Sequence, residues 1–301
     1  MSLVAGNSVM RFDFIFYFIY TRAYMVIFKA KDYVAELDLI IKNKFEKLET
    51  DKKLGIVSIG KNKNIQKFIE IKKAIALHYG IEIEDINFKN STKKSEVFSC
   101  IKNLSDSAEY GGIVVQYPFS SKYSYIEIAD KIVPSKDVDF FNPITYGSFA
   151  LNTKEEFFPP TVRALDFLLN TFKLETRGQK YVVLGQGVLV GRPVSTYLLN
   201  KGVTLFSLNE YSKQRKAVLE DADIVICASG KPNSVKGDLL KRGACVIDFS
   251  SGNKEYPGVG DFDIESNHNH LNIVSLSPGG MGPLTVRFLF LNFLEFIERS
   301  V

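Results

Sequence analysis

Hydrophobic residues recur along the first half of the chain at two spacings, one typical of helices and one typical of strands. Apolar positions at helical spacing predict amphipathic helices at 29–48, 65–79, 95–104 and 126–132. Short apolar or alternating runs predict strands at 54–59, 81–88 and 112–116. This alternation of strand and helix predicts a parallel α/β sheet.

A second alternating block follows a connector. Residues from about 136 to 158 are rich in Asp, Asn and Pro, and we expect them to form this connector. A helix is predicted at 161–172, with Thr161 as its N-cap. Beyond it, strands are predicted at 181–184, 203–208, 223–227, 244–249 and 272–275, with helices at 193–200 and 213–220. The fold class is therefore α/β, with two α/β domains.

The two ends of the chain differ from these blocks. The last predicted helix, 284–298, is so apolar that we expect it to be wedged between layers. Near the start, residues 12–20 form an aromatic run that is too short to span a membrane and lacks a signal-peptide cleavage site. We expect 1–24 to be an extension: a vector-derived or mis-assigned start, or an extra helix, and not a membrane anchor.

Composition narrows the function classes. The chain has 301 residues, enough for about two domains. The net charge of +4 comes from lysines spread along the chain, so we expect no nucleic-acid footprint. The three cysteines, Cys100, Cys227 and Cys245, lie far apart and suit a reducing compartment better than a disulfide framework.

One glycine-rich turn points to a ligand. The apolar run 182–184 ends in Gly185-Gln186-Gly187, followed by Gly191-Arg192-Pro193, where a helix can begin. Glycines and a helix N-terminus together suit a phosphate group. The spacing G-x-G-x-x-x-G is one residue longer than the common dinucleotide pattern. Taken alone, it fits an ordinary strand-to-helix turn as well as a cofactor site.

Several stretches coincide, in order and spacing, with one known family. They are Val114-Val115-Gln116-Tyr117-Pro118, Lys136-Asp137-Val138-Asp139, Pro159-Pro160-Thr161, the glycine turn, Ser229-Gly230-Lys231-Pro232, Val246-Ile247-Asp248, Val259-Gly260-Asp261 and Pro278-Gly279-Gly280-Met281-Gly282-Pro283. From about Met25 onward the chain resembles the methylenetetrahydrofolate dehydrogenase/methenyltetrahydrofolate cyclohydrolase family.

The resemblance implies a fold and a reaction. It places a folate-binding catalytic domain at 25–150, completed by the C-terminal helix 284–301, and a Rossmann-like cofactor domain at 151–283, with the active-site cleft between them. It implies oxidation of 5,10-methylenetetrahydrofolate with a nicotinamide cofactor, then hydrolysis of the methenyl form to 10-formyltetrahydrofolate. It also implies a cytoplasmic homodimer joined through the cofactor domains.

The resemblance assigns catalytic roles to Lys72 and Gln116. Lys72 matches the family lysine, which can manage protons during hydrolysis if burial or a cationic neighbour lowers its pKa. Phe68 takes the place of the family tyrosine and can still stack on the pterin ring, but it has no hydroxyl. Gln116 would hold and orient the lysine. Without the resemblance, Lys72 reads as an exposed helix lysine and Gln116 as a solvated strand end.

Other positions are assigned to the substrate. Asp139, which we count with Lys72 and Gln116 as a catalytic residue, matches the aspartate that grips the amino-pyrimidine edge of the pterin. The family's Gly-Phe-His after it is Phe140-Phe141-Asn142 here, so we expect the loop backbone to differ. Asp137 has a second interpretation as a loop cap. Further substrate-binding positions are Tyr117, Pro118, Pro278, Gly279 and Gly280.

The cofactor positions depart from the family pattern. Gln186-Gly187 stands where the family usually has Arg-Ser, which holds the 2′-phosphate of NADP. Glu210 follows the next strand, where an acid commonly binds the ribose of NAD. NADP is the family's usual cofactor, and these residues favour NAD or weak discrimination. Arg192, Lys213 and Arg215 are near enough to bind a phosphate, and Glu210 reads equally as a surface acid. The remaining cofactor positions are Gly185, Gly191, Pro193, Ser229, Gly230, Pro232 and Gly282.

No metal site is expected. His268 and His270 lie in a polar loop without further ligands that we can place, so they read as solvated side chains. Two alternatives to the bifunctional enzyme remain. One is a dehydrogenase with weak cyclohydrolase activity, because of Phe68. The other is an inactive folate- or nucleotide-binding paralogue, against which the combination of Lys72, Gln116 and Asp139 argues.

Overall fold

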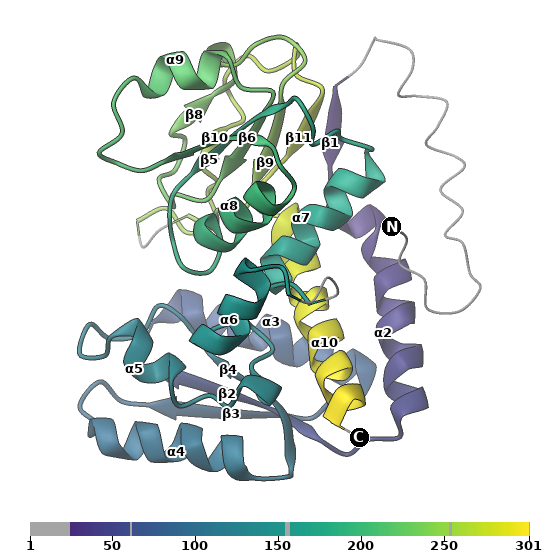
Figure 1. The fold of residues 1–301 in the computed structure, drawn as a ribbon, viewed down its shortest axis with the longest axis vertical. Helices are drawn as coiled ribbons and strands as arrows, with labels where there is room; N and C mark the ends of the chain where they lie inside the picture. The colour runs from purple at the N-terminus through teal and green to yellow at the C-terminus, as the bar shows by residue number, and fades with distance from the viewer. Residues whose placement is uncertain (1–24, 61, 154–156, 253–254, 301) are drawn as a thin grey trace.

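The chain folds into two α/β lobes that are joined by long helices (Figure 1). This computed structural model describes residues 25–60, 62–153, 157–252 and 255–300. The expectations for residues 1–24 therefore lie outside the described part. Both lobes contain parallel sheets, so the predicted α/β class is confirmed.

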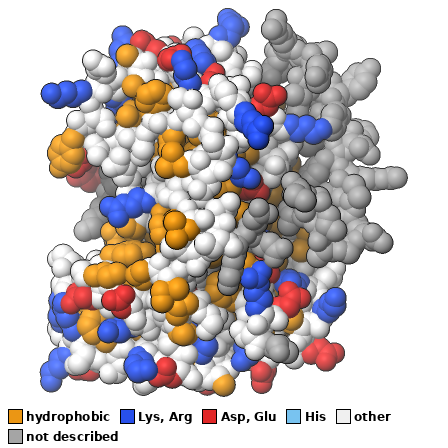
Figure 2. All heavy atoms as spheres, in the orientation of Figure 1, with side chains coloured by type: hydrophobic (Ala, Val, Ile, Leu, Met, Phe, Trp, Pro, Cys, Tyr) orange, Lys and Arg blue, Asp and Glu red, His pale blue; other side chains and the backbone are white. Residues whose placement is uncertain are grey.

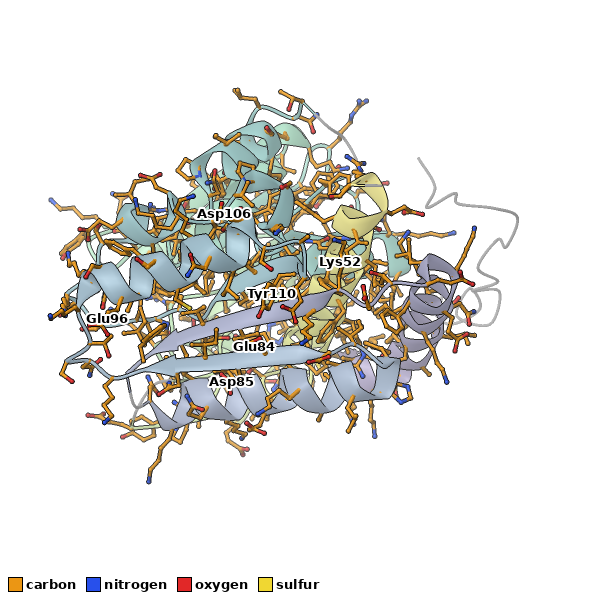
Figure 3. The ribbon with its side chains drawn as sticks, turned by 90° about the horizontal axis from the view of Figure 1, so that it is seen from below. Lys52, Glu84, Asp85, Glu96, Asp106 and Tyr110 are labelled. Atoms are coloured by element: carbon orange, nitrogen blue, oxygen red, sulfur yellow. The ribbon has the colours of Figure 1, made fainter. Side chains whose placement is uncertain are left out.

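The first lobe is built on a three-stranded sheet. Its strands β2 (Lys53–Ile59), β3 (Ile83–Phe88) and β4 (Tyr110–Val115) are parallel and ordered β3-β2-β4. Figure 3 shows helix α3 (Lys63–Tyr79) on one face and α4 (Lys94–Asp106) on the other. Successive strand side chains point to opposite faces, so Leu54 belongs to the same buried cluster as Ile69 of α3, and Val57 belongs to the same buried cluster as Ile101 of α4.

The second lobe is built on a six-stranded parallel sheet. Its order is β1-β11-β9-β7-β5-β6, and the strands are β1 (Val26–Phe28), β5 (Lys180–Leu184), β6 (Thr204–Leu208), β7 (Ile224–Cys227), β9 (Cys245–Asp248) and β11 (Ile273–Ser275). Helices α8 (Gly191–Asn200) and α9 (Arg215–Glu220) follow β5 and β6. The strands β8 (Val235–Lys236) and β10 (Phe262–Asp263) form a separate, short parallel sheet.

The strand order of the second lobe creates a crevice at β5. The chain goes from β5 through α8 to β6 on one side, and then through α9 to β7 on the other side. Ligands of open α/β sheets bind at such a reversal, beyond the carboxyl ends of the strands. The glycine turn after β5 and the loop after β7 both lie there.

Two helices join the lobes. Helix α7 (Pro160–Thr171) packs against α10 (Met281–Ser300), which also contacts β4 and helix α2 (Val34–Leu48) of the first lobe. The last helix is therefore wedged between layers, as its apolar sequence predicts. Phe290 and Phe293 are fully buried there, and each such side chain contributes roughly 1.5–3 kcal/mol.

The connector 136–158 contains a helix that was not predicted. Residues Pro143–Ala150 form helix α6. The Asn142 side chain caps it by accepting the Ile144 N–H at 2.7 Å, and Pro143 occupies the first turn, where no N–H is needed. The same Asn and Pro that suggested a break therefore start a helix. The short helix α5 (Tyr125–Ala129) precedes α6, and a capping box at Ser124 stabilises its N-terminus.

Two smaller expectations also need correction. Thr161 is not an N-cap, because Pro159 holds that position and the Thr161 hydroxyl donates to the Leu189 carbonyl at 2.9 Å. Strand β1 pairs with β11, so Val26–Phe28 lie in the second sheet and not with the rest of 25–150. This strand was not predicted, because three residues are too few to show a periodicity.

Candidate functional site

Lys72 and Gln116 come from different elements and touch. The Lys72 ammonium nitrogen, on α3, lies 2.5 Å from Oε1 of Gln116, which directly follows β4. The Gln116 amide nitrogen donates to the Tyr117 carbonyl at 3.2 Å, which turns Oε1 toward the lysine. Phe68 lies one helical turn before Lys72 on the same face of α3 and is 37% exposed. It therefore offers an aromatic surface beside the lysine.

The charges around Lys72 favour proton exchange. Burial lowers the pKa of Lys72, while the nearby Asp139 carboxylate raises it. Burial raises the pKa of Asp139 to about 6, against the opposing effect of Lys72. A lysine with a lowered pKa can accept a proton closer to neutral pH than an exposed lysine can. The predicted trio of Lys72, Gln116 and Asp139 is thus brought together.

The loop that carries Asp139 is fixed by Asp137. The two oxygens of this buried carboxylate accept the N–H groups of Phe141 at 2.8 Å and Asn142 at 2.7 Å. Asp137 is therefore the loop cap that its second interpretation described. Phe140 takes a left-handed φ of 59°, a conformation that suits the glycine found there in the family. Phe140 therefore adopts a conformation in this loop that few residues with a side chain adopt.

The glycine turn of the second lobe reaches this loop. Burial raises the pKa of Tyr125, Asp137 and Asp139 raise it further, and Arg192 of the glycine turn opposes them. Arg192 therefore lies near Tyr125 of the first lobe. Leu189, in the same turn, packs on the buried core of the first lobe. In Figure 2, hydrophobic side chains gather around the hollow where the two lobes meet.

The glycine turn itself is tightly built. A Cβ on Gly185 would lie 2.2 Å from the Ala228 carbonyl oxygen, and one on Gly191 would lie 2.0 Å from the Gly185 oxygen. A Cβ on Gly187 would meet nothing within 4 Å. Helix α8 starts at Gly191, two residues before the predicted Pro193. A compact turn with one open side, leading into a helix, fits a pyrophosphate group.

Gln186 joins the turn to the end of β6. Its amide nitrogen lies 3.2 Å from both the carbonyl and the hydroxyl oxygen of Ser207, and its Oε1 accepts from Asn209 at 3.0 Å. Glu210, which follows, pairs with Lys231 at 3.4 Å, and both side chains are more than half exposed. The sequence interpretation missed Asn209 and Lys231 as neighbours of these positions. Because β6 and β7 flank β5, the loops after them could have been expected to meet.

Other predicted cofactor residues are held by neighbouring loops. The Arg192 side chain donates to the Gln186 carbonyl at 3.1 Å. Arg215 donates instead to the Ser234 carbonyl at 3.2 Å, so the structure engages it away from Gln186. Gly230, between Ser229 and Pro232, has a φ of 66°, and a Cβ on it would meet nothing within 4 Å.

The turn 278–280 closes the second lobe against the N-terminal part of the chain. The Gly279 carbonyl accepts the Ala30 N–H at 2.9 Å. A Cβ on Gly280 would lie 2.3 Å from the Leu276 oxygen, whereas Gly279 and Gly282 have open space on that side. Among the described residues, no hydrogen bond joins Pro278, Gly279 or Gly280 to the Lys72 trio.

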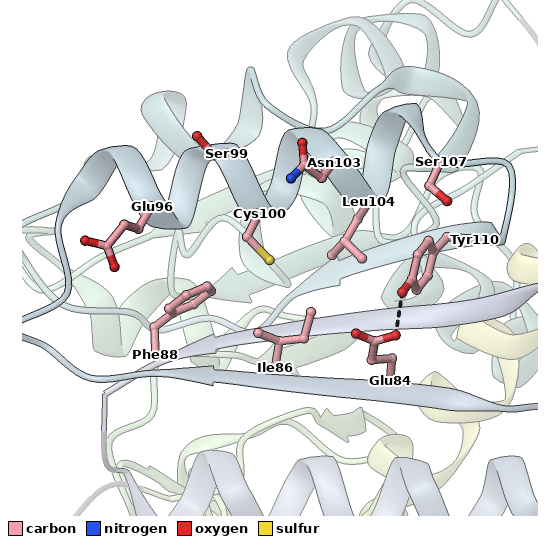
Figure 4. Close-up of a pocket in the computed structure, with 10 residues that line it drawn as sticks. All are labelled: Glu84, Ile86, Phe88, Glu96, Ser99, Cys100, Asn103, Leu104, Ser107 and Tyr110. Atoms are coloured by element: carbon pink, nitrogen blue, oxygen red, sulfur yellow. Dashed lines mark hydrogen bonds between the residues drawn. The ribbon is translucent and has the colours of Figure 1, made fainter.

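Three features lie outside this site. His268 and His270 each bond a backbone carbonyl, of Ser266 and Leu240, and the described ranges contain no group of three potential metal ligands. A hollow of about 480 Å³ between β3 and α4 contains the Glu84–Tyr110 hydrogen bond (Figure 4) and shares no residue with the predicted site. None of the helices in the described part could cross a membrane.

Comparison with known proteins decides the family. Residues 28–139 match the tetrahydrofolate dehydrogenase/cyclohydrolase catalytic domain. Residues 159–301 match the NAD(P)-binding domain of the same family. The chain belongs to the tetrahydrofolate dehydrogenase/cyclohydrolase family. The resemblance seen in the sequence is therefore confirmed.

Relatives cover almost the whole chain. The bifunctional protein FolD of Hydrogenobaculum sp. is 30% identical over 278 residues, which is 92% of this chain and 100% of that protein. The crystal structure of the Campylobacter jejuni FolD enzyme, a methylenetetrahydrofolate dehydrogenase/cyclohydrolase, has a TM-score of 0.86 and 27% identity, and covers 92% of this chain and 100% of its own. The structure of the Trypanosoma brucei FolD enzyme, complexed with NADP cofactor and inhibitor, has a TM-score of 0.87 and 25% identity. It covers 92% of this chain and 98% of its own.

Proposed function

We propose that this protein oxidises 5,10-methylenetetrahydrofolate with a nicotinamide cofactor and hydrolyses the methenyl product to 10-formyltetrahydrofolate. The family assignment supports both activities. The observation that carries the proposal is the contact between Lys72 and Gln116, beside Asp139 and opposite the glycine turn.

Hydrolysis requires a group that takes a proton from water. Lys72, with its lowered pKa, accepts that proton as the water oxygen bonds to the methenyl carbon, and returns one to the departing ring nitrogen. Gln116 fixes the lysine by accepting its hydrogen bond. Asp139 accepts N–H groups from the amino-pyrimidine edge of the pterin, and Phe68 and Tyr117 cover the ring faces. Pro118 and the turn 278–280 complete the folate contacts.

Oxidation requires a dinucleotide beside the same carbon. When bound, the nicotinamide accepts a hydride. Gly185, Gly187 and Gly191 allow the backbone to approach the pyrophosphate, and Arg192 and Pro193 lie in the first turn of the helix that faces it. Ser229, Gly230, Pro232 and Gly282 border the nicotinamide side. Gln186 and Glu210 border the adenosine ribose, where they favour NAD over NADP.

A second candidate is a dehydrogenase with weak hydrolysis. Phe68 favours it, because the side chain beside Lys72 has no hydroxyl to donate or accept a hydrogen bond. Spectrophotometry separates the candidates. Methenyl absorbance should appear when purified protein is given methylenetetrahydrofolate with NAD or NADP, and added methenyltetrahydrofolate should decay faster than in buffer. The first signal without the second would favour the second candidate, and neither signal would leave only an inactive binding protein.

We further propose a cytoplasmic homodimer joined through the second lobe. Strand β6 is the edge of its sheet, and Phe206 on it is 39% exposed. An open edge with an exposed aromatic side chain suits association with a second copy. Light scattering of the purified chain should give about twice the monomer mass. A Phe206→Glu variant should shift the mass toward that of the monomer.

A further inference from the structure

Two buried carboxylates behind the cofactor crevice have no role in the reaction described above. Asp248 ends β9 and is 1% exposed, and Asp261 precedes β10 and is fully buried. Both belong to stretches that carry the family resemblance. Burying two like charges together is costly unless hydrogen bonds compensate, so the partners of these carboxylates show what they hold.

Asp261 holds the loop after β7. Its Oδ2 accepts both the N–H and the hydroxyl of Ser229, each at 2.7 Å. The backbone around Asp261 holds the far end of the same loop, because Asn233 N–H donates to the Gly260 carbonyl at 3.0 Å and Val235 N–H donates to the Asp261 carbonyl at 2.9 Å. The loop 229–233 is therefore anchored at both ends on 260–261.

Asp248 holds the segment that carries Asp261. Its Oδ2 accepts the Phe262 N–H at 2.9 Å, and its Oδ1 accepts the Ser250 N–H at 2.8 Å. Gly260 is required here, because a Cβ would lie 2.3 Å from Oδ2 of Asp248. The two carboxylates thus share the segment 260–262 as a common support.

The same support reaches the turn at the start of the last helix. The Ser277 hydroxyl donates to the Ser250 carbonyl, and Ser277 directly precedes Pro278. A continuous chain of contacts therefore runs from Ser229 through Asp261, Asp248 and Ser250 to Ser277. In the proposed function, one end of this chain of contacts lies at the cofactor and the other end lies at both cofactor and folate.

We propose that Asp248 and Asp261 are positioning residues that couple the cofactor loop 229–232 to the 278–280 turn, so that cofactor binding tightens folate binding. The inference rests on the proposed function, because that function assigns ligands to these two segments. A coupling of this kind is reciprocal, and its usual size is about 5- to 150-fold in affinity.

The two carboxylates use their oxygens differently, and this difference makes the test specific. Asp261 receives both Ser229 donors on one oxygen, so the single carbonyl oxygen of Asp261→Asn can still accept them. Asp248 accepts the Ser250 N–H on one oxygen and the Phe262 N–H on the other. Asp248→Asn has a single carbonyl oxygen, so it can keep only one of these two hydrogen bonds. We expect Asp261→Asn to keep its cofactor Kd within about threefold, and Asp261→Ala to weaken it by about tenfold, since two hydrogen bonds are lost.

The experiment measures binding as well as turnover. Titration calorimetry gives the Kd of tetrahydrofolate with and without saturating NAD or NADP, whichever binds the wild type more tightly. The ratio of the two values should fall toward 1 in Asp248→Asn and stay at the wild-type value in Asp261→Asn. Asp263→Asn, a half-buried carboxylate in β10, is the matched control. Circular dichroism and thermal unfolding of each variant report whether it is folded, independently of ligand binding.

The outcomes separate the two proposals. A wild type that binds neither dinucleotide nor tetrahydrofolate overturns the proposed function and this inference with it. A wild type that binds both, with the same Kd ratio in Asp248→Asn as in Asp263→Asn, overturns only the inference. If Asp261→Ala does not fold, the two Asn variants alone decide, and equal effects of both on the Kd ratio count against the proposed coupling.

Discussion

The ammonium group of Lys72 and the side-chain oxygen of Gln116 lie 2.5 Å apart, although the two residues are 44 positions apart in sequence. The contact joins the middle of α3 to the end of β4. The lysine is therefore oriented by the protein before any substrate is present, and its partner accepts a hydrogen bond without adding a charge. This arrangement keeps the lysine available for proton transfer.

Replacing Lys72 should remove hydrolysis. Without the amine, no group at this position takes a proton from water, and we expect the decay of methenyltetrahydrofolate to slow by at least about 100-fold. Lys73→Ala is the matched control, because Lys73 pairs with Glu70 at 3.0 Å and is not in contact with Gln116. Hydrolysis at the wild-type rate in Lys72→Ala would remove this lysine from the mechanism.

The Asp139 carboxylate should set the pKa of Lys72 in a predictable direction. Burial lowers that pKa and Asp139 raises it, so Asp139→Asn should lower it further. NMR titration of side-chain-labelled lysine in the free protein measures the effect without substrate. The rising limb of the hydrolysis rate should move to lower pH in parallel. A Lys72 pKa that rises in Asp139→Asn would contradict the assignment.

Cofactor choice should respond to Glu210 and to its partner. A carboxylate near the ribose repels a 2′-phosphate, so Glu210→Ser should raise kcat/KM for NADP relative to NAD by about tenfold, equivalent to roughly 1.4 kcal/mol. Lys231, released from Glu210, then becomes free to pair with the phosphate. The double variant Glu210→Ser/Lys231→Ala should therefore lose most of the gain. Binding of 2′,5′-ADP against 5′-AMP tests the same preference without turnover.

A control for this prediction is available on α9. Glu220 pairs with Lys216 four residues earlier, and both side chains are exposed. Glu220→Ser removes the same charge from the second lobe without touching the loop after β6. An equal shift in cofactor ratio in this variant would mean that general charge, and not Glu210, sets the preference.

The sequence predicted most of the regular structure, because strands and helices with buried faces carry a periodicity. Strand β1 is too short to show one. Helix α6 was hidden because Asn142 and Pro143 serve a helix start as readily as a turn. The wedge position of α10 was visible in its apolar sequence, since a helix hydrophobic on most faces must be covered on most faces.

The site was predicted less evenly. The residues around Lys72 suggest only a surface lysine on a helix. Its catalytic role was predicted from the family resemblance and not from the spacing of residues. The approach of Arg192 to Tyr125 of the first lobe, and the pairing of Glu210 with Lys231, depend on how the loops lie in space. Such contacts join residues from separate elements, and no local pattern in a single sequence records them.

The left-handed backbone at Phe140 should favour glycine over alanine. A non-glycine residue at a φ of 59° costs roughly 1–2 kcal/mol. The Phe140 ring offsets this cost by packing against Phe149 and Phe296. Both Phe140→Ala and Phe140→Gly should lower the free energy of unfolding, and Phe140→Gly should be the more stable of the two by about 1 kcal/mol. Urea denaturation measures the difference in unfolding free energy. If the alanine variant were as stable as the glycine variant, the backbone at position 140 would not be strained.

The helices that join the lobes should depend on Arg163. This side chain, 9% exposed, donates from α7 to Asn292 at 2.7 Å and to both oxygens of Glu295 at 2.7 and 3.2 Å on α10. Removing it leaves the half-buried Glu295 carboxylate without this partner, which typically costs about 3–5 kcal/mol for a buried pair. Arg163→Ala should therefore lower the unfolding free energy far more than Arg242→Ala, an exposed arginine. The substitution Glu295→Gln removes the unpaired negative charge. The double variant Arg163→Ala/Glu295→Gln should therefore regain part of the unfolding free energy that Arg163→Ala loses. A double variant no more stable than Arg163→Ala would show that lost packing, and not the unpaired carboxylate, causes the effect.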